Sequence, residues 1–390
     1  MKKYDIIVVG AGPAGTTTAR KAAEKGASVL ILDKKRDIGI PVRCAEGVSE
    51  QSLRNLIDVE DTWIAQIITK SKFVAPDGTE IESVPGERGL ILHRKIFDIA
   101  LAEKAVRAGS HIITRAYVSG VIKNNEQVTG VRIEKNGKEE EIKASVVIGA
   151  DGIESHIGRW AGLNVINKKS YMLPCYQMLL SNIDIDPECV EFYLGEKVAP
   201  GGYLWIFPKG DCIANVGLGI DIEKAGQKNP FTCLNEFIKK KFPHSACLSM
   251  TAGGVTSGPS PSVIVGNGLM LVGDAAFQIN PLTGGGIINS MIAGEIAGRV
   301  AAEAVQEGNV SAKRLAVYQK EWYKKEGKNN DRSYKIKKVV SQFTDADFNK
   351  IAELLLPIPP ANRSGYQIFK KVLFKYPHLI YDVAKVFGVK

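Results

Sequence analysis

An α/β fold is predicted for this chain, with a Rossmann-type parallel sheet, an inserted antiparallel sheet and a C-terminal helical region. Three observations predict it. A glycine-rich turn follows the first apolar run, two later apolar runs also end in turns with glycine and aspartate, and a long alternating segment separates those two runs. We expect a discontinuous nucleotide-binding domain at residues 1–154 and 262–310, a sheet domain at 155–261, and the helical region at 311–390.

The first element is a buried parallel strand at Ile6–Val9, followed by the turn G-x-G-x-x-G. Gly10 permits the tight turn, Gly12 lets the backbone approach a pyrophosphate, and Gly15 lets the next helix pack closely. That helix begins at about Pro13 to Ala14, and its N-terminal amides favour a phosphate.

A second apolar run at Val29–Leu32 ends in Asp33, at the spacing of a carboxylate that binds a ribose hydroxyl. Strand, glycine turn, helix, strand and acid in this order favour a dinucleotide site over a chance glycine-rich turn. Because a carboxylate repels a 2′-phosphate, Asp33 also disfavours NADP in this pocket.

Two later strands are expected to return to the same sheet. Val146–Ile148 leads into Gly149-Ala150-Asp151-Gly152, and Leu269–Val272 leads into Gly273-Asp274. A helix with apolar positions from Ile288 to Ala304 follows. We expect its small residues to let it lie close to the sheet: Ala293, Gly294, Ala297 and Gly298.

Together, these three motifs resemble those of the p-hydroxybenzoate-hydroxylase-like flavoproteins. The resemblance implies FAD as the cofactor, with Asp274 bonding the ribityl chain and a helix start beside the flavin. It also implies that Arg94, in "HRKIFD", reaches the cofactor. Asp274 as a helix-capping or loop acid, and Arg94 as a surface ion pair, are the alternatives. The other residues expected at the cofactor from these motifs are Ala14, Val118, Asp151, Gly273, Gly285, Gly286 and Ile287.

The inserted segment is clearest at Gly201–Ile220, "GGYLWIFPKGDCIANVGLGI", which predicts an antiparallel hairpin. Period-two alternation places Tyr203, Trp205 and Phe207 on one face of the sheet. These rings are either ordinary sheet core or an apolar wall of a large substrate pocket.

The segments "PVRCAEG" and "YLWIFP" are similar to those of the geranylgeranyl reductase family, and the likeness covers nearly the whole chain. The archaeal members saturate isoprenoid chains of membrane lipids. The resemblance implies a reductase that adds a hydride from reduced flavin, plus a proton, to a C=C bond. Asp33 departs from many relatives, which carry the longer glutamate.

The same resemblance places the loop of Arg43, Cys44, Ala45 and Gly47 against the flavin. Cys44 is either the proton donor to an alkene that no carbonyl polarises, a gate for a flavin movement, or a small residue that fits under the ring. Arg43 would favour the thiolate and Glu46 the thiol.

A second G-x-G-x-x-G is absent, so the electron donor is expected to visit the flavin transiently: NAD(P)H, reduced ferredoxin or a deazaflavin. Two other functions remain open. One is an FAD-dependent aromatic monooxygenase or halogenase on the same fold. The other is a non-catalytic prenyl-binding protein, which the intact cofactor motifs disfavour. The histidines show no metal-ligand spacing, so no metal is expected.

The net charge is +9 with a pI near 9.0, and no nucleic-acid motif accompanies it. We expect a cytoplasmic protein without a signal peptide or membrane span, in peripheral contact with a membrane. Lys313–Lys338, which is basic and carries Tyr318, Trp322 and Tyr323, is the expected lipid-facing segment; a solvated helix face is the alternative.

Overall fold

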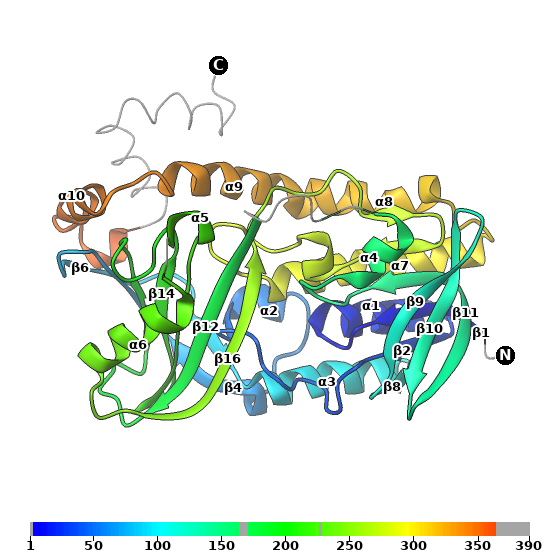
Figure 1. The fold of residues 1–390 in the computed structure, drawn as a ribbon, viewed down its shortest axis with the longest axis horizontal. Coiled ribbons are helices and arrows are strands. Elements are labelled where there is room, and N and C mark those ends of the chain that lie inside the picture. The colour runs from blue at the N-terminus through cyan, green and yellow to red at the C-terminus, as the bar shows by residue number, and fades with distance from the viewer. Residues whose placement is uncertain (1–2, 164, 166–170, 226–227, 364–390) are drawn as a thin grey trace, which may run out of the picture. The chain divides into compact units, whose positions relative to one another are not determined.

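The computed structural model describes residues 3–163, 165, 171–225 and 228–363 (Figure 1). The chain forms two compact units. The first comprises Met1–Val42, Arg94–Lys169 and Thr256–Asp331; the second comprises Arg43–His93, Ser170–Val255 and Arg332–Lys390.

The first unit is built on an eight-stranded sheet. Its main path is β17 (Val265–Gly266), β18 (Leu269–Leu271), β11 (Lys138–Gly149), β1 (Lys3–Val9), β2 (Val29–Leu32) and β8 (His111–Ile113). From β18 to β8 the neighbours are parallel, which confirms the Rossmann-type prediction. The antiparallel strands β9 (Tyr117–Asn124) and β10 (Gln127–Lys135) extend the sheet beside β11.

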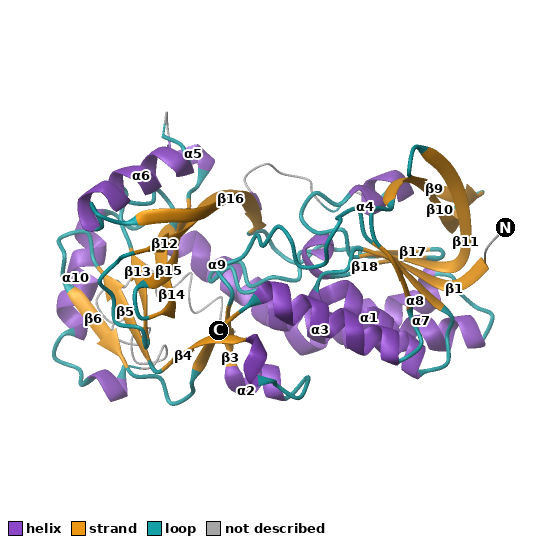
Figure 2. Ribbon diagram, turned by 90° about the horizontal axis from the view of Figure 1, so that it is seen from below, coloured by secondary structure: helices purple, strands orange, loops and turns teal. Residues whose placement is uncertain are grey.

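The helices of this unit are α1 (Pro13–Glu24), α3 (Arg94–Arg107), α4 (His156–Ala161), α7 (Ile287–Gln306) and α8 (Ala312–Trp322), with the 3₁₀ turn η3 (Gly273–Ala276). α7 lies beside α1 in both ribbon views (Figures 1 and 2). A Cβ on Gly298 would stand 2.3 Å from the Thr18 carbonyl oxygen, and one on Gly294 would stand 2.9 Å from that of Ala14. Gly294 and Gly298 therefore let α7 approach α1, while α7 also contacts β1 and β11 of the sheet.

The second unit contains a seven-stranded and a three-stranded sheet. The larger has the order β16 (Ala246–Thr256), β12 (Met172–Ser181), β15 (Ile213–Gly219), β14 (Tyr203–Gly210), β13 (Cys189–Tyr193), β5 (Lys70–Val74) and β6 (Glu80–Ser83). The smaller has the order β3 (Gly47–Ser49), β7 (Gly89–Leu92) and β4 (Ile64–Ile68). The expected hairpin is present as β14 and β15, with Trp205 opposite Gly217.

The remaining elements of the second unit are short. Among the described residues they are α2 (Glu50–Arg54), η1 (Asp61–Trp63), α5 (Ile222–Ala225), α6 (Pro230–Lys241), α10 (Asp345–Leu355) and η5 (Pro360–Asn362). η4 (Tyr323–Gly327) and α9 (Lys328–Val340) carry the chain from the first unit into the second. α6 covers one face of the larger sheet, where Leu204, Ile206, Val216 and Leu218 form the core with Leu234 (Figure 2).

The two compact units do not have the boundaries of the expected domains. Residues 43–93, expected with the nucleotide-binding domain, fall in the second unit because β5 pairs in parallel with β13. The expected C-terminal region divides, since α8 packs in the first unit while α10 belongs to the second. Residues 364–390 of that region lie outside the described residues.

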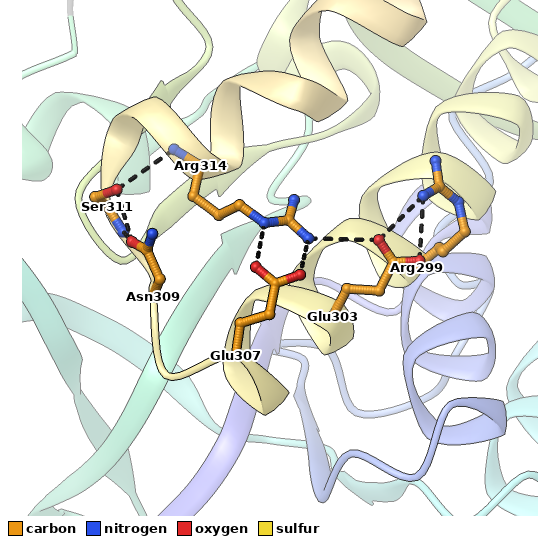
Figure 3. Close-up of polar contacts among 6 residues, drawn as sticks. All are labelled: Arg299, Glu303, Glu307, Asn309, Ser311 and Arg314. Atoms are coloured by element: carbon orange, nitrogen blue, oxygen red, sulfur yellow. Dashed lines mark hydrogen bonds and ion pairs between the residues drawn. The ribbon is translucent and has the colours of Figure 1, made fainter.

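The segment expected to face lipid begins with α8; two of its three named aromatic residues are buried, whereas Tyr323 is 43% exposed. Tyr318 is 0% exposed and Trp322 3%, and the Tyr318 hydroxyl donates to the Leu271 carbonyl at 2.8 Å. Figure 3 shows Arg314 between the carboxylates of Glu303 on α7 and Glu307, the C-cap of that helix. Arg299 also pairs with Glu303. The lipid-facing interpretation of this stretch is therefore wrong for Tyr318, Trp322 and Arg314, which join α8 to its own unit. None of the described helices has the length and apolar character needed to cross a bilayer.

Candidate active site

The glycine turn between β1 and α1 has the shape of a phosphate cradle. Gly10 has φ +108°, and a Cβ there would stand 2.2 Å from the Ala150 carbonyl oxygen. A Cβ on Gly15 would meet the Gly10 carbonyl oxygen at 1.9 Å, whereas one on Gly12 would meet nothing within 4 Å. Gly12 caps α1 without a side-chain hydrogen bond, so the first amides of α1 remain available to an anion.

Asp33 is buried at the end of β2 and holds this turn in place. Its Oδ2 accepts from the Ala11 amide at 2.8 Å and its Oδ1 from the Lys35 amide at 2.8 Å. A carboxylate oxygen can accept a second hydrogen bond, so the expected role with a ribose hydroxyl is compatible with this one.

The side chains of two other expected cofactor residues, Asp151 and Val118, have structural roles in the first unit. Asp151 accepts from the amides of His156 at 2.7 Å and Ile157 at 3.0 Å, at the start of α4. Burial raises the pKa of this carboxyl, and those N–H groups lower it in part. The Val118 side chain is buried in the core of the first unit, which leaves its backbone for any ligand.

Asp274 and the start of α7 lie together at a second candidate cofactor-binding position of the first unit. Asp274 is half-buried, and no N–H among the described residues hydrogen-bonds its carboxylate. Burial raises the pKa of Asp274, and the charge of Arg94 offsets part of that shift. Gly286, the N-cap of α7, makes no side-chain capping bond, and a Cβ on it would stand 3.5 Å from Asp274 Oδ1.

The structure bears on both alternatives for these residues. Asp274 lies in η3 and Gly286 caps α7, so Asp274 is not the cap of that helix. Arg94 bonds Asp98 through Nε at 2.8 Å and Nη2 at 3.0 Å, and the two side chains are 13% and 6% exposed. The pair is thus internal, and it holds a positive charge near Asp274.

Residues of the second unit hold the loop that carries Cys44. Cys44 Sγ accepts from the Glu46 amide at 3.2 Å. The Cys44 carbonyl accepts from Gln177 Nε2 at 3.0 Å, and Gln177 Oε1 accepts from Trp205 Nε1 at 3.0 Å. Trp205 therefore supports the loop through Gln177.

Glu46 is the deepest anchor of that loop. It has φ +75°, and its buried carboxylate accepts from Asn215 Nδ2 at 2.6 Å and forms an ion pair with Lys209. Lys209 also donates to the Leu92 carbonyl at 3.2 Å, and the Leu92 amide donates to the Glu46 carbonyl at 2.9 Å. Desolvation lowers the pKa of the adjacent His93, with a further decrease from the Lys209 charge.

Sequence reasoning missed the residues that hold the loop, namely Gln177, Lys209 and Asn215. Lone polar residues in apolar strands could have indicated them, because Gln177 and Asn215 are buried with these partners. From the sequence, Gly47 was expected to allow a close approach of the backbone to the flavin. Within the second unit, a Cβ on Gly47 would meet Phe207 Cε2 at 2.8 Å, so Phe207 already requires glycine there.

The three expected substrate-binding rings lie on the face of the larger sheet opposite α6. Tyr203, Trp205 and Phe207 are half-buried, while Leu204 and Ile206, between them in sequence, point into the core. Phe192 contacts Tyr203 and Phe207 edge-on, with ring centroids 5.8 and 5.7 Å apart. The rings are therefore not part of the core beneath α6. This aromatic face is defined by Phe73, Phe192, Tyr203, Trp205 and Phe207.

Glycine shapes the sheet beneath this face. A Cβ on Gly217 would stand 2.5 Å from the Trp205 ring, so the ring lies over β15 at that position. Burial raises the pKa of the neighbouring Cys175 to about 12 and also raises that of Tyr203. Both groups are thus neutral at physiological pH, which suits an apolar ligand.

Comparison with known proteins identifies the family to which this chain belongs. A family model described as geranylgeranyl reductase catalytic domain matches residues 172–255, and one described as FAD dependent oxidoreductase matches 5–166. The digeranylgeranylglycerophospholipid reductase of Methanosarcina acetivorans is 42% identical, with 98% of this chain and 96% of that protein aligned. The chain belongs to this reductase family. The protein of that name from Methanosarcina mazei is 43% identical, with 99% of this chain and 96% of that protein aligned.

Solved structures agree with the family. A geranylgeranyl bacteriochlorophyll reductase-like protein from Thermoplasma acidophilum has a TM-score of 0.93 and 34% identity, covering 99% of this chain and all of that one. A flavin-dependent brominase aligns with a TM-score of 0.72 at 19% identity, covering 96% of this chain and all of that one, which shows a shared fold alone. The protein is an FAD-dependent oxidoreductase of the geranylgeranyl reductase family.

Proposed function

We propose that this protein saturates C=C bonds of geranylgeranyl chains in archaeal-type glycerophospholipids. One observation carries the proposal. The segment that matches the geranylgeranyl reductase catalytic domain, residues 172–255, supplies Gln177, Lys209 and Asn215, which hold the Cys44 loop. The segment that matches the catalytic domain and the Cys44 thiol whose loop it holds therefore belong to the same unit.

The residues of the first unit fit FAD. The open cradle at Gly12 and the uncapped start of α1 suit the pyrophosphate, and Asp33 suits a ribose hydroxyl. Asp274 offers the ribityl hydroxyls a carboxylate that no described residue hydrogen-bonds, and the uncapped start of α7 favours negative charge on the ring. Reduced FAD, when bound, supplies the hydride.

Cys44 is proposed as the proton donor to the adjacent carbon of the alkene. The Glu46 amide points at Cys44 Sγ, so it would stabilise the thiolate that remains once the proton has left. The buried Glu46 and Lys209 pair fixes that amide.

The aromatic face is proposed to receive the isoprenoid chain, since half-buried rings offer apolar area without closing into a core. The donor is proposed to reduce the flavin transiently, and NAD(P)H, ferredoxin and a deazaflavin are the candidates. Because the relatives' lipid is a membrane component, we also propose that the enzyme works at a membrane surface.

The test is anaerobic reduction of the FAD-loaded enzyme with dithionite, followed by addition of a geranylgeranyl glycerophospholipid. Mass spectrometry should show two added hydrogens for each saturated bond. Flavin reoxidation without any gain in lipid mass would refute the proposal. A substituted arene formed from an aromatic substrate in air with halide would favour the halogenase, and a colourless protein that binds prenyl lipid would favour the non-catalytic alternative.

A further inference from the structure

An exposed apolar patch lies at the edge of the larger sheet, on the face that α6 covers. Leu248 and Met250 of β16 are 56% and 61% exposed, and Phe231 of α6 is 48% exposed. The Phe231 ring packs edge-on against Tyr176 with centroids 5.2 Å apart, and the Tyr176 hydroxyl lies 3.1 Å from Met250 Sδ. Leu248, two residues before Met250, shares its strand face. We call Tyr176, Phe231, Leu248 and Met250 the edge patch.

The strand that carries the patch is unusual for a sheet edge. β16 has 11 residues, ends the strand order and contains no charged side chain. Edge strands are normally short, charged or covered, and a large exposed apolar patch marks an interaction site. The edge patch is therefore expected to contact something.

The charges around the patch indicate the partner. Phe231, Asn235 and Lys239 follow one line along α6 at i, i+4 and i+8, and Lys228 is exposed just before the helix. Between residues 228 and 256 the chain has four lysines and one glutamate, Glu236. Apolar side chains flanked by lysine suit the boundary between the acyl chains and the headgroups of anionic lipids.

We propose that the edge patch docks this reductase onto an anionic lipid surface. The inference rests on the proposed lipid substrate and names the surface that reaches it, in place of the α8 region. A second copy fits less well, because a two-fold dimer through this patch would bring the lysines of both copies together.

The test measures binding to vesicles of equal parts phosphatidylcholine and phosphatidylglycerol by co-sedimentation, using the full-length FAD-loaded protein. Leu248→Ser with Met250→Ser should weaken binding about tenfold or more, because two apolar side chains are lost from the lipid contact. Lys228→Gln and Lys239→Gln should each weaken vesicle binding about fivefold. Added salt should also weaken vesicle binding.

A matched control removes equally exposed apolar side chains elsewhere. Ile99 and Val106 of α3 are 46% and 49% exposed, and Ile99→Ser with Val106→Ser should leave vesicle binding unchanged. Turnover of detergent-dispersed lipid should be unchanged in the Leu248→Ser, Met250→Ser protein. Failure of that turnover in the wild type would instead count against the proposed function.

Three outcomes would overturn the inference. The first is vesicle binding that the patch substitutions do not weaken, or that the control substitutions weaken equally. The second is a wild-type dimer in solution that becomes monomeric on Leu248→Ser with Met250→Ser, which would assign the patch to a second copy. The third is a large fall in the unfolding midpoint of that variant, which would show that the chain itself covers the patch.

Discussion

At the scale of single residues, Asp274 is expected to couple the stability of the fold to FAD binding. Burial raises the pKa of its carboxyl despite Arg94. A raised carboxyl pKa favours folding at low pH, and that contribution is lost as the pH rises through the folded-state value. Asp274→Asn should therefore raise the free energy of unfolding of the FAD-free protein at neutral pH and leave it unchanged at about pH 3. Urea unfolding at the two pH values tests this.

The same substitution should weaken FAD binding about 10- to 100-fold, because a hydrogen bond to a charged acceptor is lost. Fluorescence titration of the FAD-free protein measures the affinity. Asp274→Ala should bind more weakly still, since it offers no acceptor. A protein that gains stability and keeps its FAD affinity would show that Asp274 has no ligand.

Cys44 gives the sharpest residue-scale test of mechanism. Cys44→Ala should leave dithionite reduction intact and slow reoxidation by lipid about 10²- to 10⁴-fold, as loss of a general acid does. Cys44→Ser should restore little, because a hydroxyl is a far weaker acid. Single-turnover reoxidation of the three proteins against pH is the measurement. If both variants reoxidise at nearly the wild-type rate with altered FAD affinity, Cys44 has only a packing role.

At the scale of elements, the β14–β15 hairpin supplies the anchor for the Cys44 loop. Lys209→Met leaves the Glu46 carboxylate buried without its cation, which should cost about 3–5 kcal/mol of unfolding free energy. Lys70→Met, which breaks an exposed pair with Asp186 in the same unit, should leave the urea unfolding midpoint nearly unchanged. Equal costs in urea unfolding would contradict a buried anchor. Glu46→Gln added to Lys209→Met should recover part of the loss.

Elements also show where sequence reasoning succeeds and where it stops. Alternation along one strand was enough to place Tyr203, Trp205 and Phe207 on a common face. Their contacts with Phe192 depend on the register between strands, which no single strand records. Leu315, Tyr318 and Trp322 recur at i, i+3 and i+7, a core-facing helical stripe, so the burial of α8 was readable in the sequence.

At the scale of the whole molecule, the chain crosses between the two units five times, so neither unit is one continuous segment. The nucleotide motif was predictable because its strand, turn and acid are adjacent in sequence. The assignment of residues 43–93 was not, because it depends on the pairing of β5 with β13 across more than 100 residues. The cofactor features belong to the first unit and the Cys44 loop to the second.

Because these features are divided between the units, the effect of FAD can be read in each unit separately. If the Cys44 loop meets the cofactor, FAD should slow amide hydrogen exchange in residues 10–15 of the first unit and also in residues 43–47 of the second. At about 100 times its dissociation constant, FAD adds about 2.7 kcal/mol, or about 100-fold slower exchange where opening requires its release. Peptides from β6, at the opposite end of the larger sheet from β12, should exchange unchanged.

Exchange with and without FAD, read by mass spectrometry, separates the possibilities. Protection confined to residues 10–15 would mean that FAD binds the first unit alone, and the proposal that Cys44 protonates the substrate beside the flavin would fail. Protection of residues 43–47 in Asp274→Ala at the same FAD concentration should fall together with that of residues 10–15, because both depend on one bound ligand. If Asp274→Ala changed the protection of only one of these two segments, residues 10–15 and 43–47 would not share one bound FAD.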